Sequence, residues 1–165
     1  LFQGAHIKKT MDDAEEKTLW SQSGSIELRN ITQISNEYNI NEIILIDDDV
    51  INNFYHQMLI KEEIGFNGDI TIFVNANEAL TYVKKQNSIK QQLFLVDINM
   101  PSMNGFEFIE AYRALKRKIP PIVLLTTSHN PSDWDRATEY PEIKIYKNKP
   151  LSVSMVEEIF REIFS

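Results

Sequence analysis

Three apolar runs of this chain, and a fourth stretch that is mostly apolar, lead into residues with charged or hydroxyl side chains. The runs and the residues that follow them are Ile43–Ile46 with Asp47, Asp48 and Asp49, Leu93–Val96 with Asp97, Ile122–Leu125 with Thr126, and Ile143–Tyr146 with Lys149 and Pro150. Continuous apolar runs of this length are typical of strands buried on both faces of a parallel sheet. Because ligands bind beyond the carboxyl ends of such strands, we expect these side chains to gather in one pocket.

Carboxylates gathered in this way could perform phosphoryl transfer. Because they repel one another at neutral pH, they must share a proton or bind a cation. Their oxygen ligands suit Mg²⁺, which usually leaves coordination positions open for water or a phosphate oxygen. An aspartate can also act as a nucleophile and form an acyl phosphate. The cation, the ammonium of Lys149 and the hydroxyl of Thr126 would then each cover one phosphoryl oxygen.

The chain around these runs alternates between strand and helix patterns. Strands are expected over 42–46, 69–74, 92–96, 121–126 and 143–146, and helices over 51–64, 77–85, 106–116, 132–139 and 152–164. The short connections match right-handed βαβ units. We therefore predict a three-layer, doubly wound (βα)5 α/β fold of the flavodoxin-like kind, with a parallel five-stranded sheet. The order 2-1-3-4-5 comes from fold analogy, because the pattern itself gives only the alternation.

Individual helix positions follow from the same pattern. The apolar side of the first helix is expected at Phe54, Met58 and Leu59, and His56 is expected to be exposed or to cap a helix. Ser132 is expected to be the N-cap of the fourth helix, because a serine at this position can accept from the first free backbone N–H groups.

The chain divides into three parts. Residues 1–10 are assigned to a tag-derived leader, because Leu1–Gly4 matches the remnant of a protease-cleavage tag. Residues 11–40 form a polar extension, in which 25–38 is either a loose leader or a short amphipathic helix. Residues 41–165 form the folded domain.

Composition excludes several classes of function. The chain has 165 residues, of which 42% are hydrophobic, enough for one domain with a core. The net charge of −7 argues against non-specific nucleic-acid binding. There is no cysteine, which excludes disulfides and thiolate metal sites. No apolar run approaches the ~20 residues that span a bilayer, so we expect a cytoplasmic protein with no membrane contact.

From about Ile43 to Phe164 the chain resembles the receiver domain of two-component response regulators, of the single-domain, chemotaxis-regulator-like kind. The matching motifs are Ile46-Asp47-Asp48-Asp49, Asp97-Ile98-Asn99-Met100-Pro101 with Gly105, Leu124-Leu125-Thr126, Tyr146, and Lys149-Pro150. The spacing Asp-x-x-Met-Pro-x-x-x-Gly is the most specific of these motifs, and finding all of them in order strengthens the resemblance.

The resemblance implies roles for the polar residues. Asp97 matches the phosphoacceptor, which is also a metal ligand. Asp48 matches the direct metal ligand, and Asp47 the carboxylate that usually acts through a metal-bound water. Asn99 matches the residue whose backbone carbonyl binds the cation, and Lys149 the lysine that pairs with the phosphoryl group. The third acid of the first run is expected to be solvated or to cap the first helix.

The resemblance also implies a conformational switch. Thr126 matches a hydroxyl that moves toward the phosphoryl group, and Tyr146 an aromatic residue that swings inward with it. Pro150 is expected to follow a cis peptide bond. Thr127 departs from the family, which has alanine or glycine there, and its bulk is expected to narrow access to the site.

The implied function is that of a phosphorelay receiver. Asp97 would accept a phosphoryl group from a phosphohistidine of a histidine kinase or histidine phosphotransfer protein, in a Mg²⁺-dependent reaction. The output would be contact with a downstream protein target, by a monomer or weak dimer that is no enzyme beyond its own phosphorylation and dephosphorylation. No nucleic-acid partner is expected.

Other interpretations stay open. The chain is either a complete single-domain regulator or a receiver excised from a larger protein such as a hybrid kinase. A receiver-like binding module that is never phosphorylated is one alternative, to which Thr127 lends some support. An aspartyl-phosphate-forming phosphatase is another, although it would need a second acid where this chain has Asn99. A flavodoxin fits less well, because no Ser/Thr/Gly-rich phosphate loop follows the first strand.

Overall fold

The computed structural model describes residues 40–86, 91–127 and 130–164. The expectations for the leader, for the extension up to residue 39 and for His129 lie outside these residues.

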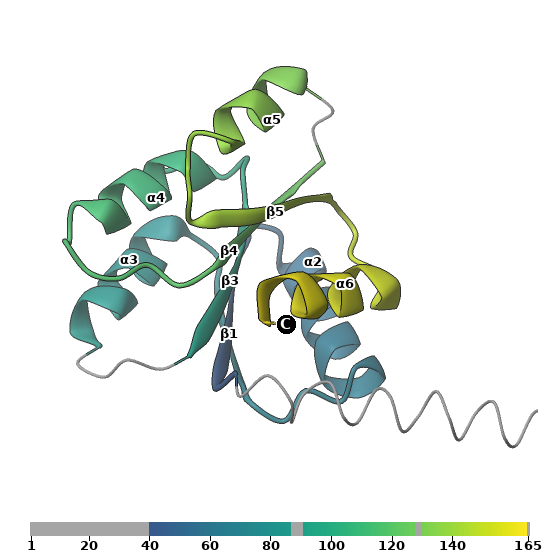
Figure 1. Ribbon diagram of the computed structural model, residues 1–165. Helices are drawn as coiled ribbons and strands as arrows, with labels where there is room; N and C mark the ends of the chain where they lie inside the picture. Colours follow the sequence, from purple (N-terminus) through teal and green to yellow (C-terminus); the bar gives the residue numbers. More distant parts are fainter. Residues whose placement is uncertain (1–39, 87–90, 128–129, 165) are drawn as a thin grey trace, which may run out of the picture.

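A parallel five-stranded sheet forms the centre of the domain (Figure 1). Its strands are β1 (Glu42–Ile46), β2 (Asp69–Phe73), β3 (Gln92–Asp97), β4 (Ile122–Thr126) and β5 (Ile143–Asn148). They lie in the order β2-β1-β3-β4-β5, as predicted. The central strands β1, β3 and β4 are buried along their whole length, which explains their continuous apolar runs. In the register, Ile46 pairs with Val96, so the residues after β1 lie beside the end of β3.

Five α-helices of the described residues cover both faces of the sheet. They are α2 (Val50–Met58), α3 (Ala76–Lys85), α4 (Gly105–Arg113), α5 (Pro131–Ala137) and α6 (Val153–Phe164), and α2 continues into a π-helical turn, Leu59–Glu63. Core residues of α3, α4 and α5 pack on one face, and those of the π-helical turn that continues α2 and of α6 pack on the other. In none of these helices are length and apolarity sufficient to cross a membrane.

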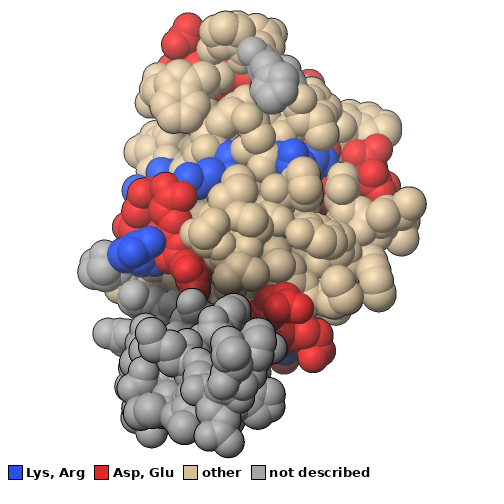
Figure 2. All heavy atoms as spheres, turned by 90° about the vertical axis from the view of Figure 1, so that its right-hand side faces the viewer, with Lys and Arg blue, Asp and Glu red and all other residues tan. Residues whose placement is uncertain are grey.

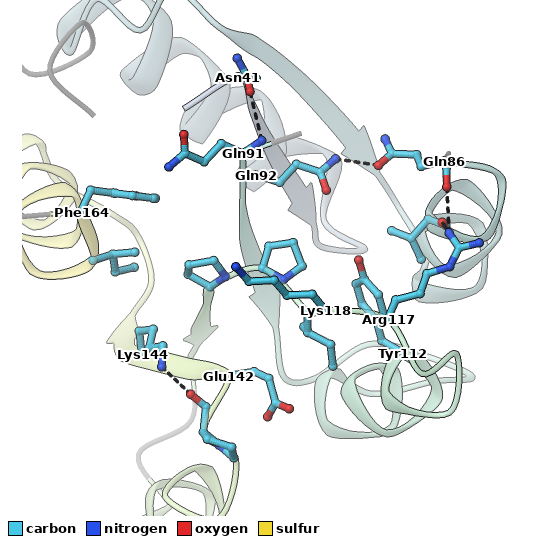
Figure 3. A pocket seen from close by; sticks show the side chains of 16 residues that line it. Asn41, Gln86, Gln91, Gln92, Tyr112, Arg117, Lys118, Glu142, Lys144 and Phe164 are labelled. Carbon is cyan, nitrogen blue, oxygen red and sulfur yellow. Dashed lines mark hydrogen bonds between the residues drawn. The ribbon is translucent and has the colours of Figure 1, made fainter. Parts of the chain in front are cut away.

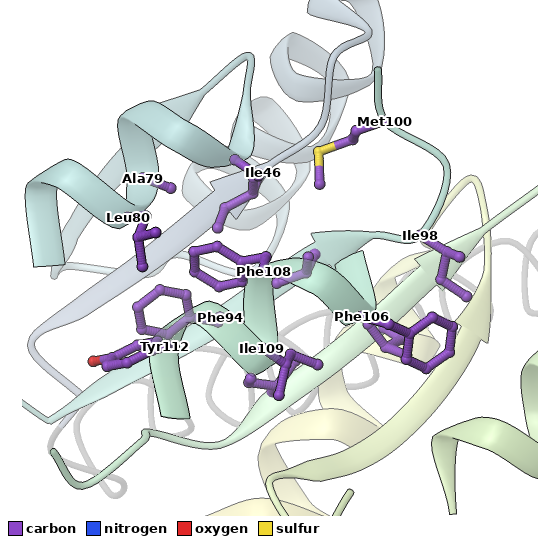
Figure 4. Close-up of a cluster of buried hydrophobic side chains, with 14 of the residues drawn as sticks. Ile46, Ala79, Leu80, Phe94, Ile98, Met100, Phe106, Phe108, Ile109 and Tyr112 are labelled. Atoms are coloured by element: carbon purple, nitrogen blue, oxygen red, sulfur yellow. The ribbon is translucent and has the colours of Figure 1, made fainter. Parts of the chain in front are cut away.

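Alternate side chains of each strand enter the two cores. On the face of α3 and α4, aromatic rings of β3 and α4 dominate (Figure 4). The centroid of the Phe94 ring lies 6.1 Å from that of Phe108 and 5.8 Å from that of Tyr112. These distances are in the range of favourable aromatic pairs, so this core fixes α4 and the loop that leads into it from β3.

The inward face of α2 differs from the prediction. The Phe54 side chain is 65% exposed, Met58 is exposed as well, and only Leu59 of the expected apolar side is buried. Asn53 and His56 face inward instead, and His56 is only 1% exposed. Buried polar side chains usually form hydrogen bonds, and both residues bond to the backbone of other segments, although Asn53 Oδ1 has no partner among the described residues.

The N-cap of α5 also differs from the prediction. Asn130, and not Ser132, caps this helix, and its side-chain oxygen accepts from the Ser132 N–H at 3.1 Å. Pro131 occupies the first helical turn, where its missing N–H costs no hydrogen bond.

Candidate functional site

Three carboxylates meet at the carboxyl ends of β1 and β3. Asp47 and Asp48 directly follow β1, and Asp97 is the last residue of β3. One carboxylate oxygen from each residue lies within 4.8 Å of the others. Asp47 and Asp97 are buried, whereas Asp48 is exposed, so the cluster opens to solvent on the side of Asp48.

Lys149 joins the two buried carboxylates. Its ammonium nitrogen lies 2.9 Å from Asp47 Oδ2 and 2.8 Å from Asp97 Oδ2. The backbone N–H of Lys149 donates to the carbonyl oxygen of Thr126 at 2.8 Å, which fixes the loop after β5 beside the end of β4. The Lys149–Pro150 peptide bond is cis, as predicted.

Burial and charge have opposite effects on the pKa values of Asp47 and Lys149. Burial raises the pKa of Asp47, although hydrogen bonds from Lys149 and from the Asp49 N–H counteract it. Burial alone would lower the pKa of Lys149, but its hydrogen bonds and charge interactions with Asp97 and Asp47 outweigh that effect and raise it. The cluster brings together three carboxyl groups and one ammonium, so its acids outnumber its base by two. A divalent cation would therefore balance the cluster.

The loop after β3 shapes the Asp97 side of the cluster. The Asn99 N–H donates to Asp97 Oδ1 at 3.3 Å, while the Asn99 side chain is exposed. The Gly105 N–H donates to the Ile98 carbonyl at 3.0 Å and closes the loop. A Cβ atom at Gly105 would meet the Asp97 carbonyl oxygen at 2.6 Å, so only glycine fits this approach.

Thr126 connects the cluster to the molecular surface. It ends β4 and is fully buried, and its side chain shares a hydrogen bond with the Tyr146 hydroxyl. Burial, helped by the charge of Asp133, raises the pKa of Tyr146, and this hydrogen bond opposes the rise. The Tyr146 ring also meets the exposed ring of Trp134 edge-on, with centroids 5.4 Å apart. A chain of contacts therefore leads from the site to α5.

Asp49 caps α2, as one of the two expectations for it stated. Its Oδ1 accepts from the N–H groups of Ile51 at 2.8 Å and Asn52 at 3.2 Å. The Asp49 N–H in turn donates to Asp47 Oδ1 at 2.9 Å. The three consecutive acids thus have different tasks, because the third one orients the helix and does not join the cluster.

Sequence reasoning missed three residues of α2 that support the site. The Asn53 side-chain amide donates to the Asp47 carbonyl at 2.7 Å. His56 Nε2 accepts from the Leu151 N–H at 3.3 Å, and the Tyr55 hydroxyl donates to the Leu151 carbonyl at 3.2 Å. The three-residue spacing of Asn53 and His56 was the one available signal, since it places both on one face of a helix.

Two surface hollows lie at different distances from the carboxylate cluster. The smaller, of about 470 Å³, opens beside Asp48 and is also lined by Asn75 and Pro101, so it leads to the cluster. The larger, of about 1120 Å³, lies at the opposite end of the sheet, where the strands begin (Figure 3). Its Arg117 guanidinium already donates to the carbonyls of Val83 and Gln86. The larger hollow is therefore separate from the carboxylate site.

A parallel sheet in this order, with carboxylates and a lysine at the carboxyl ends of its strands, is the architecture of receiver domains. The family model of the response regulator receiver domain matches residues 43–159. The chain belongs to this family.

The matches to curated relatives cover only parts of those longer proteins. The nitrate/nitrite response regulator protein NarL of Escherichia coli is 33% identical over 94 residues, which are 55% of this chain and 40% of NarL. A protein-glutamate methylesterase/protein-glutamine glutaminase of Clostridium acetobutylicum is 31% identical over 87 residues, which are 53% of this chain and 24% of that protein. The chain thus matches less than half the length of either relative.

Solved structures of receivers match almost over their whole length. A response regulator receiver protein of Dyadobacter fermentans is 26% identical with a TM-score of 0.63, covering 74% of this chain and 97% of that one. A two-component response regulator of Cytophaga hutchinsonii is 25% identical with a TM-score of 0.64, covering 76% and 97%. The receiver domain of a Pseudomonas aeruginosa sensor histidine kinase, with a magnesium ion in its active-site cleft, shares the fold at 22% identity and a TM-score of 0.61, covering 76% and 99%.

Proposed function

We propose that this receiver accepts a phosphoryl group on Asp97 from a phosphohistidine of a histidine kinase or histidine phosphotransfer protein. A carboxylate oxygen of Asp97 forms a bond to phosphorus while the bond from phosphorus to the donor imidazole breaks. The bonding electron pair stays on the imidazole nitrogen. The observation that carries this proposal is the position of the Lys149 ammonium, 2.8 Å from Asp97 Oδ2. At this distance the ammonium can pair with an oxygen of a phosphoryl group attached to Asp97.

Mg²⁺ fits this site by charge and ligand chemistry. The cluster of Asp47, Asp48 and Asp97 offers hard oxygen ligands and an excess of negative charge. The Asn99 backbone carbonyl is proposed as a further ligand. When bound, Mg²⁺ supplies positive charge that neutralises the transferring phosphoryl group. The magnesium in the Pseudomonas aeruginosa receiver supports the same assignment here.

The Thr126 hydroxyl is proposed to donate to a phosphoryl oxygen. To do so it would exchange its hydrogen bond with Tyr146 for one with the phosphoryl group. The Tyr146 ring would then change its contact with Trp134. This rearrangement would carry the phosphorylation state to the surface around α5, where a downstream protein target would read it.

The donor protein is proposed to bind an apolar patch on α2. Val50, Ile51 and Phe54 are exposed large hydrophobic residues in the first turns of this helix, next to the carboxylate loop. Figure 2 looks toward the side of the molecule that carries α2 and α6, where a broad central area lacks charged residues. Exposed apolar patches of this kind mark protein-binding surfaces.

Phosphorylation with a small donor tests the assignment of Asp97. Incubation with acetyl phosphate and Mg²⁺ should add one phosphoryl group, detected by intact mass spectrometry, and Asp97→Asn should abolish the addition. Wild-type protein that gains no mass with acetyl phosphate or with a phosphohistidine protein would favour the unphosphorylated binding module. Rapid turnover of phosphomonoesters would favour the phosphatase.

A pair of single-charge variants tests the metal site. Mg²⁺ at about ten times its Kd should raise the free energy of unfolding of the wild type by about 1.4 kcal/mol, measured by urea denaturation. Asp48→Asn should lose most of this increase. Asp49→Asn removes the same charge one residue away and keeps a capping side chain, so it should retain it. Equal losses in the two variants would mean that Mg²⁺ binding depends only on the net charge of the protein.

Two phosphodonors of different size test the proposed donor-binding surface on α2. Phe54→Asp should slow transfer from a phosphohistidine protein and leave the rate with acetyl phosphate unchanged, because only the protein donor contacts α2. A variant with unchanged rates for both donors would place the docking surface elsewhere.

A further inference from the structure

The loop that carries Lys149 is held from two sides. On one side the Lys149 N–H donates to the Thr126 carbonyl at the end of β4. On the other side, two residues further on, both backbone polar groups of Leu151 bond to α2. The Leu151 N–H donates to His56 Nε2, and the Leu151 carbonyl accepts from the Tyr55 hydroxyl. One turn of α2 therefore clamps the loop after β5.

The clamp depends on a neutral histidine. His56 is buried, and because Nε2 accepts a hydrogen bond, the proton of the ring must be on Nδ1. Burial, helped by the charge of Lys149 and opposed by the charge of Asp97, lowers the pKa of His56 to about 4. His56 is thus an acceptor at neutral pH.

The same helix also holds the carboxylate loop. The Asn53 side chain lies on the buried face of α2 one turn before His56 and donates to the Asp47 carbonyl. One face of α2 therefore bonds to the backbone of two segments, one carrying Asp47 and the other carrying Lys149. The Asp47–Lys149 contact at 2.9 Å depends on how these segments lie relative to one another.

We infer that His56 is a positioning residue for phosphoryl transfer, which holds Leu151 so that the Lys149 ammonium stays between Asp47 and Asp97. This inference rests on the proposed function. It requires a hydrogen-bond acceptor at this position, and side-chain volume alone does not suffice. A group displaced by about 1 Å can slow a reaction by up to about 100-fold, so a released lysine loop should affect the rate strongly.

Three variants separate positioning from packing. His56→Leu removes the acceptor and keeps an apolar side chain, whereas His56→Gln places an amide oxygen near the position of Nε2. Ile64→Val is the matched control, because Ile64 is buried in the same core just after the π-helical turn and forms no hydrogen bond to the lysine loop through its side chain. With acetyl phosphate at saturation, His56→Leu should be slower by about 10- to 100-fold, and His56→Gln should recover to within about threefold of wild type.

A second measurement reports whether the Lys149 ammonium is held in place, and it needs no phosphorylation. The ¹⁵N NMR signal of the Lys149 ammonium is expected in the wild type, because two carboxylates hold it and slow its exchange with water. The signal should disappear in His56→Leu and persist in His56→Gln and Ile64→Val. If His56→Leu does not fold, His56→Asn replaces it with the same expectations, since its shorter amide cannot reach Leu151.

The outcomes are distinct. A His56→Leu variant with the wild-type rate and an intact ammonium signal overturns the inference. Equal slowing in His56→Leu, His56→Gln and Ile64→Val also overturns it, because packing alone would then explain the effect. If the wild type is not phosphorylated at all, the proposed function fails. The ammonium signal still decides the positioning role in that case, and its loss in His56→Leu alone supports it.

Discussion

Acidification should destabilise the fold through His56, by an amount that the structure sets. Burial, aided by the charge of Lys149, lowers the pKa of this residue from 6.5 to about 4. Between these values the unfolded chain binds a proton at His56 and the folded protein does not, so the free energy of unfolding falls as the pH falls. The two pKa values correspond to about 3 kcal/mol in total, of which about 2 kcal/mol is lost between pH 7.5 and pH 5.0.

Urea unfolding of wild type and His56→Gln at these two pH values measures this effect. The glutamine does not titrate, so the wild type should lose about 2 kcal/mol more than the variant on acidification. The Asp47 carboxyl and the other two histidines, His6 and His129, are present in both proteins, and their contributions cancel in the comparison. Losses that agree within about 0.5 kcal/mol would refute the buried, neutral state of His56.

Two further predictions concern the surroundings of the site. Gly105→Ala should lower the free energy of unfolding by about 1–3 kcal/mol and slow phosphorylation, because its Cβ would meet the Asp97 carbonyl oxygen. Gly65→Ala, at φ +71° with open space around it, should cost about 1–2 kcal/mol without slowing phosphorylation, and equal slowing in both would contradict the local clash. In a Trp20→Phe background, phosphorylation should change the fluorescence of Trp134, whose ring contacts that of Tyr146. Unchanged emission in fully phosphorylated protein would contradict that coupling.

The sheet and its acids could be predicted because the central strands are buried on both faces. Complete burial produces continuous apolar runs, and the residues just after those runs must lie at the same edge of a parallel sheet. This reasoning brought Asp47, Asp48, Asp97 and Lys149 together, and their distances agree with it. The strand order required fold analogy, because alternation of strands and helices is compatible with several orders.

The buried face of α2 could not be predicted in the same way. Apolar periodicity selected Phe54 and Met58, yet the helix turns Asn53 and His56 inward. Burial of those two residues depends on backbone partners 6 and 95 residues away, and one sequence does not show which distant groups are free to bond. These bonds offset part of the cost of burying the two polar side chains, while Phe54 and Met58 stay exposed.

Helix α2, which carries the apolar patch, and helix α5, which carries Trp134, lie on opposite faces of the sheet (Figure 1). A donor seated on α2 would contact a different face from α5, so a target on α5 could bind the same receiver in a ternary complex. In such an assembly the acyl phosphate would not have to survive a diffusive search for its target. The strength of the output would then depend on local concentration within the complex more than on the lifetime of the phosphorylated receiver.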